Sequence, residues 1–104
     1  MSINKFRLPL TNAEARWMFL NLRRLPATIH AEEVGWLLGM SFQEVSILVS
    51  KKCIKPLGNP AVNARKRFSC LATLSLGEDE KWKNDALKVL AAYWRERNQT
   101  TSKT

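Results

Sequence analysis

The stretch that decides the fold runs from Ala31 to Ser50 and reads AEEVGWLLGMSFQEVSILVS. Apolar residues recur at helical spacing on both sides of its middle, where Gly39, Met40 and Ser41 interrupt the period. Gly39 can adopt the positive φ of a tight turn, and Ser41 can accept hydrogen bonds from the free N–H groups of a following helix. The stretch therefore predicts two short helices joined by a tight turn, the second over residues 42–52.

Small and apolar residues occupy the positions that a close crossing of these two helices needs. Gly35 lies in the middle of the first helix, where a small residue lets the second helix approach. The residues predicted to point inward are Val34, Leu38, Met40, Val45 and Leu48. Together these features resemble a helix-turn-helix, whose second helix reads the DNA major groove. An ordinary hairpin of two helices would show glycine and leucine at similar spacing, and it stays open as the alternative.

The outer face of the second helix carries side chains that can contact base edges. Gln43 can form two hydrogen bonds with adenine, Ser46 can reach a base or a phosphate, and Ile47 can contact a thymine methyl group. Glu44 is either an acceptor for cytosine or a solvated charge. The other residues predicted to contact DNA from this helix are Ser41, Phe42, Ser50 and Lys51. Because no guanine-reading arginine is among them, we expect modest sequence specificity from this helix alone.

A basic segment without acidic residues follows the second helix. Residues 53–57 alternate in polarity, Gly58 to Pro60 form a turn cluster, and an extended pattern resumes at residues 66–68. This pattern predicts a two-stranded hairpin, or wing, with a loop of about eight residues. Its basic side chains can follow phosphates or enter a minor groove. The predicted DNA contacts here are Lys51, Lys52, Lys55, Asn59, Asn63, Arg65, Lys66 and Arg67. A solvated run of charges is the other interpretation.

The order of these features resembles a known group of proteins. A helix-turn-helix, a short basic wing and the sequence KRFS at residues 66–69 resemble, over residues 28–76, the winged-helix DNA-binding domain of MerR-type regulators and the related excisionase-like proteins. The resemblance implies a second helix in the major groove and a wing on the flanking backbone. The chain lacks the long dimerisation coiled coil and the effector domain of MerR regulators, and it has an extra helix before the motif. It therefore resembles the excisionase-like proteins or small regulators of this group more than the MerR regulators.

Helices are also predicted on both sides of this region. Thr11 and Glu14 have the form of a capping box that begins a helix over residues 12–24. An acidic start opens a C-terminal helix over residues 78–98. Its apolar stripe comprises Trp82, Ala86, Val89, Leu90, Tyr93 and Trp94. We expect this stripe to pack on the first helix or, through its exposed part, to pair two protomers.

The composition fits one small domain with unevenly distributed charge. The 104 residues predict a single, mainly α-helical DNA-binding domain with an extended arm at residues 1–10 and a flexible tail at residues 99–104. The formal net charge is +8, and residues 51–104 carry twelve basic and five acidic side chains. Such a charge favours a polyanion or an anionic membrane surface. No apolar run reaches the roughly 18 residues of a membrane span, so no membrane-spanning segment is expected. Because the basic segment follows a predicted helix-turn-helix, duplex DNA is the expected partner.

Several other classes are not supported by the sequence. Two cysteines and one histidine are too few for a zinc site or a disulfide framework, so we expect no metal or cofactor and interpret Cys53 and Cys70 as small buried hydrophobes. No nucleophile motif surrounds His30, and no glycine-rich phosphate loop occurs, so no enzyme is expected. We expect a cytoplasmic protein, nucleoid-associated when bound, that acts as a small transcriptional regulator or a recombination accessory factor.

Two other functions remain as alternatives. One is a protein-interaction adaptor that docks through the aromatic C-terminal helix. The other is a single-strand or RNA binder that stacks bases on its tryptophans. For Trp36, Trp82 and Trp94 the sequence favours packing in the core instead, because each lies within a predicted apolar helix face.

Overall fold

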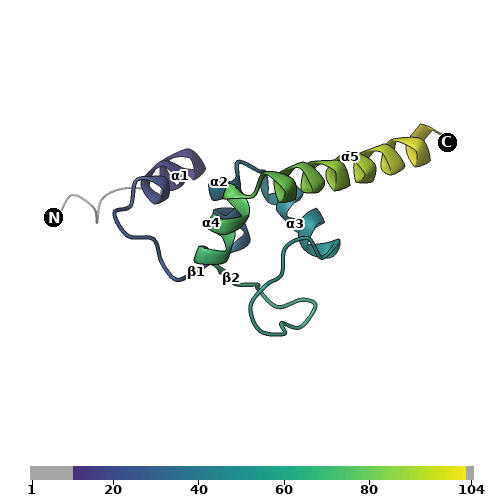
Figure 1. The fold of residues 1–104 in the computed structure, drawn as a ribbon. Coiled ribbons are helices and arrows are strands. Elements are labelled where there is room, and N and C mark those ends of the chain that lie inside the picture. The colour runs from purple at the N-terminus through teal and green to yellow at the C-terminus, as the bar shows by residue number, and fades with distance from the viewer. Residues whose placement is uncertain (1–10, 103–104) are drawn as a thin grey trace.

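The computed structural model describes residues 11–102, with the side chains of residues 11–98, so the predicted arm at residues 1–10 lies outside the described residues. Within that range the chain forms helices and one small antiparallel sheet (Figure 1). The elements are α1 (Asn12–Leu20), β1 (Thr28–Ile29), α2 (Ala31–Leu38), α3 (Phe42–Ser50), β2 (Phe68–Ser69), α4 (Cys70–Glu78) and α5 (Glu80–Ser102). The prediction of a mainly α-helical chain with a small two-stranded sheet is confirmed.

The turn between α2 and α3 has the local structure that the sequence predicts. Gly39 ends α2 with φ of +71°, a conformation that favours glycine. Ser41 Oγ accepts from Glu44 N at 3.1 Å, and Glu44 Oε1 accepts from Ser41 N at 2.9 Å, which closes a capping box at the start of α3. Gly35 is buried, and a Cβ atom there would overlap the Met40 carbonyl oxygen. The predicted need for a small residue at position 35 is confirmed, and the nearest obstacle is the backbone of the turn between α2 and α3.

The end of α3 comes two residues before the predicted residue 52. Lys52 N donates to Val49 O at 3.0 Å and Cys53 N donates to Leu48 O at 2.8 Å, the hydrogen-bond pattern of a Schellman motif. Lys52 occupies the left-handed position of this motif with φ of +65°, which is uncommon for a residue other than glycine, asparagine or aspartate. The motif turns the chain away from the axis of α3.

The predicted hairpin wing is wrong in its strand pairing. Residues 53–57 form no strand, and β2 pairs with β1, which precedes α2, so that Thr28 lies opposite Ser69 and Ile29 opposite Phe68. Pro56 has no N–H to donate to a ladder, and one backbone hydrogen bond, from Leu57 N to Arg67 O at 2.7 Å, joins the two limbs of the segment in the described structure. Residues 51–67 therefore form an irregular segment, here named the basic loop, whose far end is held by β2.

The hydrophobic core lies where α2, α3, α4 and the sheet meet. The largest fully buried side chains are Phe68, Ile29, Leu48, Val34 and Val45. Two of them come from the sheet, so the short β1–β2 pairing places one large apolar residue of each strand in the core. α1 packs on α2, where the rings of Phe19 and Trp36 lie 5.6 Å apart between centroids. This aromatic contact anchors the N-terminal helix.

The N-terminal helix α1 is shorter than predicted. It ends at Leu20 instead of residue 24, because Asn21 caps it and donates from Nδ2 to Trp17 O at 2.8 Å. Phe19 of this helix is buried, whereas Met18, and Leu22 beyond its end, are each 48% exposed.

The C-terminal helix α5 begins at Glu80, two residues after the predicted start at residue 78, and continues further than predicted. Asp79 Oδ1 accepts from Trp82 N at 3.0 Å and caps the start. The helix runs to Ser102, beyond the predicted residue 98, and residues 103–104 of the predicted tail lie outside the described residues. It packs mainly on α3 and α4. The prediction that its stripe packs on the first helix is therefore wrong. In Figure 1 its C-terminal part projects away from the other helices.

The two cysteines are free thiols, and they differ in burial. Cys70 is 4% exposed, and desolvation by burial, with a smaller contribution from the charge of Glu33, raises the pKa of its thiol. Cys53 is half-buried beside α5, where its carbonyl oxygen accepts from Trp82 Nε1 at 3.2 Å. The prediction that Cys70 is a small buried hydrophobe is confirmed. None of the described helices has the length and apolar character that crossing a membrane requires.

Candidate nucleic-acid interface

The outer face of α3 presents the side chains that the sequence assigned to base reading, with one exception. Phe42, Gln43, Ser46 and Ser50 are exposed, and Phe42 retains 56% of its accessible surface. Ser41 is exposed as well, with its hydroxyl engaged as the cap of α3. A polar, solvent-facing helix surface of this kind can offer donors and acceptors to the base edges in a major groove.

Ile47 is the exception. It is 5% exposed, so the prediction that it lies on the exposed face of this helix is wrong. The physical reason is that α3 contacts α2 and also α5, so more of its circumference is covered than two crossing helices alone would cover. The exposed apolar side chain on this helix is Phe42, which sequence reasoning included in the site without giving it a role.

The basic loop carries cations without acidic partners. Lys66 is half-buried and the others are exposed; the set is Lys51, Lys52, Lys55, Arg65, Lys66 and Arg67. Arg67 Nη1 donates to Thr28 Oγ1 at 3.2 Å, and Lys66 Nζ donates to Val62 O at 3.4 Å. In residues 11–98 no carboxylate forms an ion pair with any of the six. Their charge is therefore available to an anion.

Ion pairs occur on α5 instead. Lys81 Nζ lies 2.9 Å from Asp85 Oδ2, and Lys83 Nζ lies 2.8 Å from Glu80 Oε2. The hydrogen bond from Lys81 and the charge of its ammonium group hold the pKa of Asp85 below its usual value. The positive charge of α5 is thus partly neutralised within the helix, whereas that of the basic loop is not.

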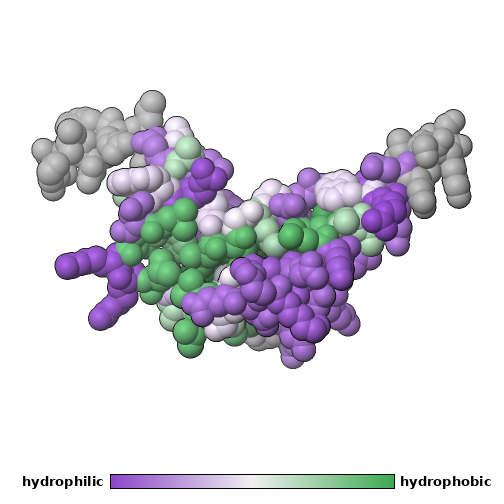
Figure 2. Space-filling model, turned by 45° about the horizontal axis from the view of Figure 1, so that its top comes forward, coloured by the Kyte–Doolittle hydropathy of each residue, from purple (hydrophilic) through white to green (hydrophobic). Residues whose placement is uncertain are grey.

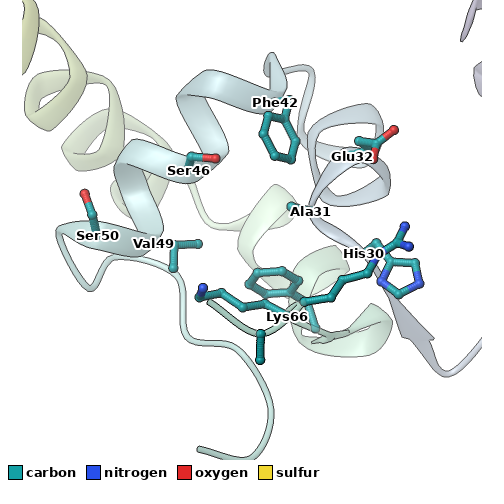
Figure 3. A pocket seen from close by; sticks show the side chains of 11 residues that line it. His30, Ala31, Glu32, Phe42, Ser46, Val49, Ser50 and Lys66 are labelled. Atoms are coloured by element: carbon teal, nitrogen blue, oxygen red, sulfur yellow. The ribbon is translucent and has the colours of Figure 1, made fainter. Parts of the chain in front are cut away.

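A cavity of about 410 Å³ lies between α3, the start of α2 and the basic loop (Figure 3). Its lining residues are His30, Ala31, Glu32, Phe42, Ser46, Val49, Ser50, Ala64, Arg65, Lys66 and Phe68. In Figure 3, Ser46, Val49 and Ser50 lie along one side of it, and Lys66 lies across from them. The fold therefore places the polar face of α3 and the cations Arg65 and Lys66 around the same cavity.

His30 forms one wall of this cavity. His30 is the N-cap residue of α2, and its backbone N donates to Glu33 Oε1 at 2.9 Å. Its Nδ1 atom is buried and has no hydrogen-bond partner in the described part of the chain. Because this atom has almost no accessible surface, a ligand in the cavity would not reach it.

A second cavity, of about 420 Å³, lies on the other side of Phe42. It is lined by Asn12, Arg16, Glu32, Trp36, Met40, Ser41 and Phe42. Sequence reasoning missed both cavities and the roles of Val49, Arg16 and Glu32 in them, because each cavity joins segments that are distant in the chain.

The remaining predicted contacts lie along the basic loop. Asn59 and Asn63 are exposed but line neither cavity. Lys51, Lys52 and Lys55 follow the end of α3 and are not among the lining residues. Among residues 11–98, no group of three or more histidine, cysteine or acidic side chains is placed to hold a metal ion. Comparisons with protein families, with curated proteins and with solved structures find no match to this chain.

Proposed function

We propose that this protein binds duplex DNA, with α3 in the major groove and the basic loop along the phosphate backbone. The observation that carries the proposal is the position of the exposed polar face of α3 beside Arg65 and Lys66, two of the six basic-loop cations that no carboxylate pairs with in residues 11–98. An α-helix fits the major groove, and lysine and arginine side chains gain affinity by displacing counterions from phosphates. A neutral small-molecule substrate would require neither feature.

The predicted resemblance to winged-helix proteins applies here with one change, because the wing is not a regular hairpin. β1 and β2 hold the two ends of the segment that contains α2, α3 and the basic loop. The basic loop then acts as a wing without a regular hairpin. We propose that the protein works as a small transcriptional regulator or as a recombination accessory factor, in line with the MerR-type and excisionase-like pattern of its sequence.

The α3 face supplies the first test. In the double variant Gln43→Ala, Ser46→Ala, the ratio between binding to a selected site and binding to random duplex is expected to fall about tenfold or more, because a bidentate base contact contributes roughly 1–3 kcal/mol of discrimination. The measurement is fluorescence anisotropy at fixed salt, with the site obtained by selection from random duplexes. Asn84→Ala, which removes an exposed amide from α5, is the matched control. An unchanged ratio in the double variant would remove α3 from base reading, and stronger binding to single strands would favour the single-strand alternative.

Specific binding requires more than one protomer, because a single module of this kind buries only about 600–1,000 Å² on DNA. Pairing is predicted through the exposed part of the helix that carries Trp82, Leu90 and Trp94. Leu90, at 3% exposed, and the half-buried Trp82 add little to that surface. Two apolar residues seven positions apart on α5 remain exposed, Leu87 at 56% and Trp94 at 36%. Residues at this spacing lie on the same helix face. We propose that two protomers pair through this face on inverted half-sites.

The pairing face is tested by adding charge. The variant Leu87→Glu, Trp94→Glu is expected to bind a two-half-site duplex as one protomer per DNA instead of two, measured by sedimentation velocity, because burial of unpaired carboxylates opposes association. Ala92→Glu adds a charge to a different exposed position of the same helix and should keep two protomers bound. One wild-type protomer bound tightly to a single half-site would contradict the pairing.

One observation favours a second function, protein docking. Large apolar side chains are exposed on α1 and α4, and Figure 2 shows hydrophobic surface gathered between the two ends of the molecule. The most exposed of them are Leu71 of α4 at 76% and Trp17 of α1 at 66%. Exposed apolar patches often mark protein interfaces. An adaptor of this kind would show no salt-dependent affinity for duplex DNA, which the experiment with the basic loop described in the Discussion measures directly.

A further inference from the structure

The cavity between α3 and the basic loop has the size and the walls of a small-molecule site. Its volume of about 410 Å³ lies within the range of roughly 300–1,000 Å³ that is typical of ligand pockets. Apolar side chains from separate segments enclose it, namely Phe42 and Val49 from α3 and Phe68 from β2. Phe42 is 56% exposed, so an apolar group in the cavity would cover surface that the protein itself leaves open to water.

The polar groups of the cavity favour an anion with one charge. Arg65 and Lys66 contribute two cations without acidic partners in residues 11–98. Glu32, at the same wall as His30, is a carboxylate and opposes multiply charged anions. An amphipathic molecule with an apolar body and a single carboxylate matches this combination of walls and charges.

We infer that this cavity binds a small aromatic monocarboxylate, with its ring against Phe42, Val49 and Phe68 and its carboxylate toward Arg65 and Lys66. The ligand occupies the same face of α3 that carries Ser46 and Ser50. It therefore excludes α3 from a DNA groove, so that ligand and DNA bind in competition. Binding of the ligand does not depend on the proposed DNA binding. The competition between ligand and DNA rests on that proposed function. The domain would then respond to a metabolite directly.

Titration with 1-naphthoate tests the site directly. The backbone amide signals of residues 42–50 and 64–66 are expected to shift and saturate in ¹H–¹⁵N spectra of the full chain at fixed ionic strength. The uncharged 1-naphthamide and the small anion acetate should each bind at least about tenfold more weakly, because the first lacks the charge and the second lacks the apolar body. Absence of saturation by 1-naphthoate, or shifts confined to other parts of the chain, overturns the inference.

Two variants locate the ligand within the cavity. Lys66→Gln and Phe42→Ala are each expected to weaken 1-naphthoate binding about tenfold, a change that corresponds to roughly 1.4 kcal/mol. Lys52→Gln makes the same chemical change at a loop position outside the lining residues and should leave the affinity within about twofold of the wild-type value. Equal losses in Lys66→Gln and Lys52→Gln would show only general charge attraction and would overturn the site. Phe42 is exposed, so its variant is expected to fold.

A competition assay separates the two proposals. With duplex DNA bound, saturating 1-naphthoate is expected to lower the apparent DNA affinity at least about tenfold, and acetate at the same ionic strength should not. Naphthoate binding in a protein that has no affinity for DNA would retain the site and reject the proposed function. Naphthoate binding that leaves DNA affinity unchanged would overturn the competition.

Discussion

Gly35→Val is expected to lower the free energy of unfolding by about 3 kcal/mol or more, because overpacking at a rigid contact costs 1–3 kcal/mol and here the obstacle is backbone. A Cβ atom at this position would overlap the Met40 carbonyl oxygen and contact Val45 Cγ2 at 3.5 Å. The Met40 carbonyl cannot withdraw freely, because Met40 N is fixed by its 2.8 Å hydrogen bond to Gly35 O. The loss amounts to a large part of the stability of a small domain. Urea or thermal unfolding followed by circular dichroism measures it.

The matched control is a second helical glycine. A Cβ atom at Gly77 in α4 would meet Leu38 Cδ2 at 3.5 Å, an ordinary contact. Gly77→Ala is therefore expected to be neutral or to stabilise the protein by up to about 1 kcal/mol, since alanine is the better helix former. Gly35→Ala should destabilise, and it keeps the comparison measurable if the valine variant does not fold. Equal effects of alanine at the two glycines would mean that α2 and α3 do not cross closely at Gly35.

Alanine at Arg65, Lys66 and Arg67 together is expected to flatten the salt dependence of DNA binding. If five or six side chains of the basic loop contact phosphates, log K falls with log salt with a slope of about −5, and the triple variant should reduce that slope by about two to three units. At low salt the affinity should fall steeply for every duplex sequence, because phosphate contacts do not read bases. Anisotropy titrations from 50 to 200 mM salt measure both quantities.

An equal change of net charge elsewhere provides the control. Alanine at Lys81, Lys83 and Lys88 removes three cations from α5, two of which already pair with carboxylates. This variant should keep the slope within about one unit of the wild-type value. If both triple variants flatten the slope equally, the loop has no special place in the interface. Arg65 and Arg67 are exposed and Lys66 is half-buried, so unfolding is not expected to explain the loss.

Features of the fold that depend on neighbouring residues were predictable from the sequence. The end of α2 at Gly39, the cap of α3 at Ser41 and the cap of α1 at Thr11 each depend on residues within one turn of a helix. A capping side chain or a residue with positive φ affects only the backbone of the adjacent helical turn, so the neighbouring residues suffice to predict it. The need for glycine at residue 35 was also predictable, because the following turn brings the two helices together at that position.

Features that depend on distant contacts were not predictable. β1 and β2 contain two residues each and lie on either side of the basic loop and the α2–α3 pair, so no local alternation marks their pairing. The burial of Ile47 depends on the packing of α5 against α3, which the period of α3 does not contain. The cavity at His30 likewise depends on where the basic loop returns to the sheet. Of the candidate site, the exposed residues of α3 and the cations were therefore predictable, and their grouping around one cavity was not.

The antiparallel pairing of Thr28–Ile29 with Phe68–Ser69 has a consequence for protein engineering. Paired residues of neighbouring strands lie roughly 5 Å apart, so the segment between them begins and ends at almost the same point in space. Such a segment is suited to transplantation, because a host protein would need to offer only one surface hairpin to receive both of its ends. The basic loop is by the same reasoning a place to open the chain, since new termini there would leave every helix and both strands continuous.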